Sequence, residues 1–136
     1  MNEILKLNVK MRLKRTGSLV FTKGKKVVTL RYLRLFDVVT DLVSLCKKLQ
    51  YAQNPRDETL LLTDMRKSQW LLQIMKVGNE CQIVVSKVLT NPALQPVEKL
   101  KWKGSFSSFV TSVKALVHLL YFKGHLMVKL PTRFHG

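Results

Sequence analysis

Cations alternate with apolar residues near the start of the chain, over residues 4–15. Apolar side chains occupy the odd positions from Leu5 to Leu13. Lysine and arginine occupy even positions between them and end the run, at Lys6, Lys10, Arg12, Lys14 and Arg15. Because successive side chains of a β-strand point to opposite faces, one face of such a strand is cationic and the other can enter a core. A cationic face suits the binding of a polyanion, such as the phosphate backbone of a nucleic acid.

A second group of cations surrounds an aromatic residue, in the sequence Lys99-Leu100-Lys101-Trp102-Lys103 before Gly104. Lysine neutralises phosphate and tryptophan stacks on an unpaired base, so this pattern suits single-stranded or looped RNA. A core position for Trp102 is the alternative. The complete set of predicted RNA-binding residues is Lys6, Lys10, Arg12, Lys14, Arg15, Lys23, Lys25, Lys26, Arg31, Lys99, Lys101, Trp102 and Lys103.

A third group is weaker. Trp70 follows Arg66 and Lys67 within a segment that we read as helical. Packing in the core or against a partner is the preferred role for Trp70, and base stacking is the second choice. Arg66 and Lys67 either extend the basic surface or form the solvated face of the helix.

Residues typical of catalysis and metal binding lack the required spacing. The three histidines show no H-x-x-x-H pattern, and Cys46 and Cys81 form no C-x-x-C pair. Asp37 and Asp41 share one face of a predicted helix, and Asp57 and Glu58 sit where a helix start favours negative charge. The sequence has no phosphate-binding glycine loop and no G-x-S-x-G. We therefore expect no enzyme, no metal, no cofactor and no small-molecule substrate.

The balance of charge favours a polyanionic partner. The 136 residues carry 24 Lys and Arg against 8 Asp and Glu, a formal net charge of +16, and 46% are hydrophobic. The hydrophobic content predicts a folded chain, and the charge favours a protein that works in a complex. Residues 1–34 contain ten basic residues and one acid. Residues 35–64 contain three basic residues and five acids, and residues 65–136 contain eleven basic residues and two acids. The near-neutral middle is the candidate for a buried or protein-facing element.

The elements that must position these cations come from the spacing of apolar residues. We expect one α+β domain over residues 1–136, with an N-terminal basic β-meander, then amphipathic helices and one or two further short strands. The meander covers residues 1–33, with a turn at Gly24. A helix pair covers 34–77, broken at Pro55 and ended at Gly78. Residues 80–136 hold a strand over 82–89, a basic loop, a helix from Phe106 that Ser105 caps and Gly124 ends, a short strand over 126–130 and a tail.

These expectations favour a non-catalytic RNA-binding subunit of a ribonucleoprotein, most of all a small ribosomal protein that docks on rRNA. Neighbouring proteins of the complex would contact its apolar helices. The alternative is a membrane-apposed or assembly protein that binds anionic lipid, resembling a viral matrix protein or a peripheral subunit of a membrane complex. The cations are spread over strands and loops, which argues against membrane contact. The two cysteines and the missing secretory signal indicate a reducing intracellular compartment, with the mitochondrial or another organellar matrix favoured over the cytosol.

Overall fold

Three antiparallel strands pair in chain order at the start of the chain. The computed structural model describes residues 4–12, 16–51, 55–91 and 93–132, with side chains up to Tyr121. The strands are β1 (Leu5–Met11), β2 (Thr16–Lys23) and β3 (Lys26–Arg34). Gly24 begins the two-residue turn between the paired Lys23 and Lys26, and its φ of 58° is a value that glycine adopts without strain. The sequence predicts strands over this stretch, and the structure has them.

A helix follows the third strand directly. α1 (Leu35–Gln50) occupies the stretch where apolar residues recur at spacings of three and four. Its buried side chains are Leu35, Val38, Val39, Leu42, Leu45, Cys46 and Leu49. Asp37 lies in the first turn, and Lys47 and Lys48 lie in the last, which complements the helix dipole. α1 contacts β2 and β3 on one side and β4 on another.

A second antiparallel meander of four strands replaces most of the predicted helices. Its strands are β4 (Arg56–Thr63), β5 (Gln69–Val77), β6 (Glu80–Val88) and β7 (Val97–Ser105), paired in chain order. The predicted helix over residues 55–77 is wrong, because β4 and β5 form a hairpin there. The predicted basic loop before Phe106 is also wrong, because residues 97–105 form β7. Gly78, expected to end a helix, instead starts the β5–β6 turn with a φ of 59°.

The last element, α2 (Phe106–Thr132), begins where the sequence predicts it and ends later. Ser105 caps it, since its Oγ accepts a hydrogen bond from the backbone N–H of Ser108 at 3.1 Å. The predicted strand over 126–130 is wrong, because the helix continues through Gly124 to Thr132. A glycine inside a helix costs only about 1 kcal/mol, so Gly124 alone is a weak stop signal.

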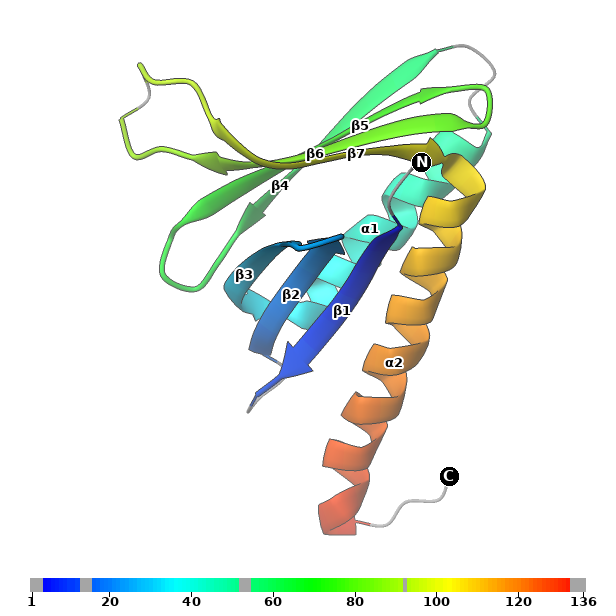
Figure 1. Cartoon of the computed structure of the whole chain (residues 1–136). Helices are drawn as coiled ribbons and strands as arrows, with labels where there is room; N and C mark the ends of the chain where they lie inside the picture. Colours follow the sequence, from blue (N-terminus) through cyan, green and yellow to red (C-terminus); the bar gives the residue numbers. More distant parts are fainter. Residues whose placement is uncertain (1–3, 13–15, 52–54, 92, 133–136) are drawn as a thin grey trace.

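Both sheets and both helices share one hydrophobic core. The four-stranded sheet lies across one end of the three-stranded sheet, and α2 runs along the side of the molecule beside β1 (Figure 1). Fully buried side chains come from every layer, including Phe21, Leu42, Ile74, Leu100 and Phe109. The predicted α+β architecture, a meander followed by amphipathic helices, is therefore wrong: the described chain is mostly β, with seven strands and two helices. None of the described helices is long and apolar enough to cross a membrane.

Candidate nucleic-acid interface

The alternation in β1 separates its cations from the core. Leu5 and Val9 are buried, and Val9 has no exposed surface at all. Lys6, Lys10 and Arg12 are exposed on the other side of the strand. The predicted residues Lys14 and Arg15 lie outside the described residues.

A side chain of the β2–β3 turn joins the two predicted basic segments, which lie far apart in sequence. Lys23 Nζ donates a hydrogen bond to the backbone carbonyl of Lys101 at 2.7 Å. Lys25 in the turn and Lys26 at the start of β3 are both exposed. An ammonium group has three donors, so Lys23 can hold β7 and still offer hydrogen to a phosphate. The structure thereby places the lysines of the turn beside those of β7.

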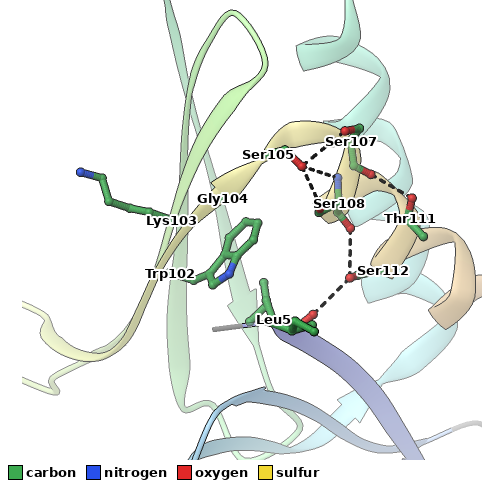
Figure 2. A pocket seen from close by; sticks show the side chains of 10 residues that line it. Leu5, Trp102, Lys103, Gly104, Ser105, Ser107, Ser108, Thr111 and Ser112 are labelled. Carbon is green, nitrogen blue, oxygen red and sulfur yellow. Dashed lines mark hydrogen bonds between the residues drawn. The ribbon is translucent and has the colours of Figure 1, made fainter. Parts of the chain in front are cut away.

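β7 alternates in the same way as β1. Lys99, Lys101 and Lys103 are exposed, whereas Leu100 and Trp102 are buried. The Trp102 side chain is 4% exposed and packs over Gly104, and Figure 2 shows it directed away from Lys103. Of the two alternatives for this ring, the structure has the core position, where a base cannot reach it. Read as a strand, the alternation of Lys99 to Lys103 would already have grouped Trp102 with Leu100.

The start of β1 borders this region. Leu5 pairs with Lys23, and Leu5 lines the same groove as Lys103. The exposed Lys6 follows Leu5 but points to the opposite face of β1, away from Lys23. We call the combined region the lysine surface, and its members are Lys23, Lys25, Lys26, Lys99, Lys101 and Lys103.

The remaining predicted cations lie at the other end of the three-stranded sheet. Lys10 pairs with Ser18, and Ser18 faces a β-bulge in which Arg31 and Tyr32 oppose a single residue. The structure thus divides most of the predicted set into the lysine surface and a second group of Lys10, Arg12 and Arg31, and it leaves Lys6 in neither. The β4–β5 turn adds the exposed Arg66 and Lys67 to the bulge, because the backbone N–H of Met65 donates to the Tyr32 carbonyl at 2.8 Å. The sequence flagged Arg66 and Lys67 but placed them on a helix, and it gave no signal for Tyr32.

The lysine surface lacks acidic partners. Among the residues that the structure describes, one ion pair is found, and it joins Arg56 to Glu58 on β4 with an Nε–Oε2 distance of 2.6 Å. No carboxylate therefore pairs with a lysine of the surface within this part of the chain. Lysines without a carboxylate partner repel one another, and a phosphate backbone would relieve this repulsion.

A groove of about 550 Å³ lies between the start of β1, β7 and the first turns of α2 (Figure 2). Besides Lys103, its polar lining consists mainly of serines and a threonine at the end of β7 and on α2, which bond to each other and to the backbone. Ser112 Oγ donates to the Leu5 carbonyl at 3.2 Å, and Thr111 Oγ1 donates to the Ser107 carbonyl at 2.9 Å. Asn79 Oδ1 accepts from the Ser107 N–H at 3.2 Å. These bonds use the donors of the helix start, so the groove joins α2 to the sheets and is poorly suited to bind an anion.

The two cysteines are buried thiols. Burial raises the pKa of Cys46 to about 11. Burial and the nearby Cys46 raise the pKa of Cys81 to about 11, against an opposing effect of Lys76. Both thiols are therefore protonated at neutral pH, and a thiol is a poor nucleophile and metal ligand. The described residues contain no group of three or more His, Cys, Asp and Glu side chains placed to hold a metal.

Comparison with known proteins gives no relative. No protein-family model matches the chain, and neither a curated protein nor a solved structure matches it.

Proposed function

We propose that this protein is a non-catalytic RNA-binding subunit of a ribonucleoprotein particle, such as a ribosome, and that the lysine surface binds the RNA backbone. The observation that carries the proposal is the hydrogen bond from Lys23 to the Lys101 carbonyl. It joins two basic segments, 78 residues apart in sequence, into one surface. Contacts with phosphate dominate the affinity of such surfaces and carry little sequence information.

The rigidity of the positions supports this role. Lys99, Lys101 and Lys103 are exposed side chains of a strand whose alternate residues, Leu100 and Trp102, are buried in the core. Their Cα atoms are therefore held at spacings of about 6–7 Å along the strand. A row of fixed cations loses less conformational entropy on binding than a flexible tail does.

The experiment compares RNA with anionic lipid. The purified protein is first tested for bound nucleic acid by ultraviolet absorbance and nuclease sensitivity. Its binding to a labelled single-stranded RNA is then measured by fluorescence anisotropy, and its binding to vesicles that contain phosphatidylserine by flotation. We expect RNA binding that exceeds vesicle binding. Vesicle binding without RNA binding would contradict the proposal and favour the membrane-apposed alternative.

A further inference from the structure

Two residues at the end of the molecule away from the lysine surface hold their backbone in an unusual conformation. Tyr32 has a φ of 62° and Lys67 a φ of 71°, and these are the positive φ values of non-glycine residues in the described chain. Positive φ is a strained conformation for residues with bulky side chains. Strain of this kind gathers at functional sites and persists only where surrounding contacts impose it.

Contacts with neighbouring strands and turns impose this conformation. The β-bulge in β3 turns Tyr32 outward, and its side chain is 38% exposed. The Tyr32 carbonyl accepts the N–H of Met65, which fixes the β4–β5 turn against β3. Within that turn, Asp64 Oδ1 accepts the N–H groups of Arg66 and Ser68 at 2.8 and 2.9 Å. The turn is therefore held rigidly against the bulge.

The result is a planar cation fixed over an aromatic ring. Arg66 Cζ lies 4.0 Å from the centroid of the Tyr32 ring, a cation–π distance. Arg66 is exposed, and among the described residues it has no carboxylate partner. One side of its guanidinium rests on Tyr32, so the other side is open to a flat ligand. Lys67 follows Arg66 in the turn, and Arg31 precedes Tyr32 in the bulge, so both add positive charge beside the pair.

A second pair of the same kind joins β5 to the neighbouring strand β6. Lys87 Nζ lies 4.6 Å from the centroid of the half-buried Trp70 ring. Trp70 pairs with Leu62, one step along the ladder from the Thr63–Gln69 pair that borders the turn. This end of the molecule therefore combines cations and aromatic rings, which is the combination that single-stranded nucleic acids bind.

We infer that the exposed face of the Arg66 guanidinium, held by Tyr32, is a stacking site for an unpaired base of single-stranded RNA. The inference rests on the proposed function and extends it from the RNA backbone to a base. Arginine stacks on bases through its planar guanidinium, whereas lysine offers only a point charge. Tyr32 is the positioning residue, and Arg66 makes the contact.

The test measures dependence on the base. The probes are a single-stranded oligoadenylate of about 12 nucleotides, within the range of single-strand site sizes, and the same oligonucleotide with a run of abasic residues in its middle. Arg66→Lys keeps the charge and removes the plane. We expect it to weaken binding of the oligoadenylate about tenfold and to leave binding of the abasic probe unchanged. The matched control, Arg56→Lys on β4, should change neither affinity.

Variants of Tyr32 test the positioning role. Asparagine tolerates positive φ better than most residues, so Tyr32→Asn removes the ring without adding backbone strain. Tyr32→Asn should reduce the preference for the base-bearing probe. Tyr32→Phe keeps the ring and should therefore keep the preference. Equal binding of both probes by the wild-type protein would overturn the stacking site and leave the proposed function standing. An equal loss on both probes in Arg66→Lys would also overturn the site. Binding of neither probe would overturn the site and the proposed function together.

Discussion

At the scale of single residues, neighbours along β7 have opposite roles. Lys101 and Lys103 are exposed to solvent, and Trp102 between them belongs to the core. The sequence predicts the exposure of the lysines, because a lysine is rarely buried without a partner. It could not settle the position of Trp102, because a basic segment bracketed by Pro96 and Gly104 looked like a loop. The pairing of β7 with β6 decides the matter, since it directs Trp102 to the buried face.

The burial of Trp102 predicts an effect on stability. Trp102→Ala should lower the free energy of unfolding by about 3–5 kcal/mol, because it removes a buried ring and leaves a cavity. Lys103→Ala, the matched control on the exposed face, should change it by less than about 0.5 kcal/mol. Urea denaturation followed by circular dichroism measures both. An unchanged midpoint for Trp102→Ala would show that the ring is not part of the core.

At the scale of elements, the region that local sequence signals describe least well is the β4–β5 hairpin. Asn54 and Pro55 resemble a helix start, and the leucines from Leu60 to Leu62 show no clear period of two. Lys67 in the turn has a positive φ. A glycine or asparagine at this position would have predicted the turn from the sequence. The hairpin is specified by its pairing with β6 and by contacts with α1. β1 and α1, whose patterns are strongly periodic, were predictable from the sequence alone.

Gly17 on β2 lies so close to the backbone of β1 that a side chain at this position should destabilise the fold. A Cβ built on Gly17 would lie 2.1 Å from the Lys10 carbonyl oxygen and 2.8 Å from Leu35 Cδ1. Because the first of these atoms belongs to the backbone, Gly17→Ala should displace the end of β1 and destabilise the fold by about 1–3 kcal/mol. Gly78→Ala is the control, since its Cβ would meet nothing within 4 Å and would add only the strain of its positive φ. Thermal unfolding compares the two variants, and a Gly17→Ala protein as stable as Gly78→Ala would contradict the close approach.

At the scale of the whole molecule, charge is unequally distributed over the fold. The near-neutral residues 35–64 form α1 and β4, which contact each other. Cations of residues 1–34 and 65–136 form the lysine surface and the group around the β3 bulge, whereas others, such as Lys114 on α2, lie apart from both. The sequence shows the total charge and its three segments. It does not show that Lys23 meets Lys101, because no local pattern reports a contact between distant segments.

Salt dependence reports how many phosphates the whole protein contacts. If the protein neutralises about six to ten phosphates of a single strand, the slope of log K against log salt is about −4 to −7. The test variant replaces Lys99, Lys101 and Lys103 with glutamine. The matched control replaces Lys47, Lys48 and Lys114, which are exposed on α1 and α2, and it changes the net charge by the same amount.

The most direct measurement of the central claim is therefore the salt slope of single-stranded RNA binding for the wild-type protein and these two variants. We predict that the slope becomes shallower by about two in the Lys99, Lys101 and Lys103 variant, on the same rule of about 0.7 per phosphate. The control variant should keep the wild-type slope. Equal changes in both variants, or a wild-type affinity that does not depend on salt, would contradict RNA binding through the lysine surface.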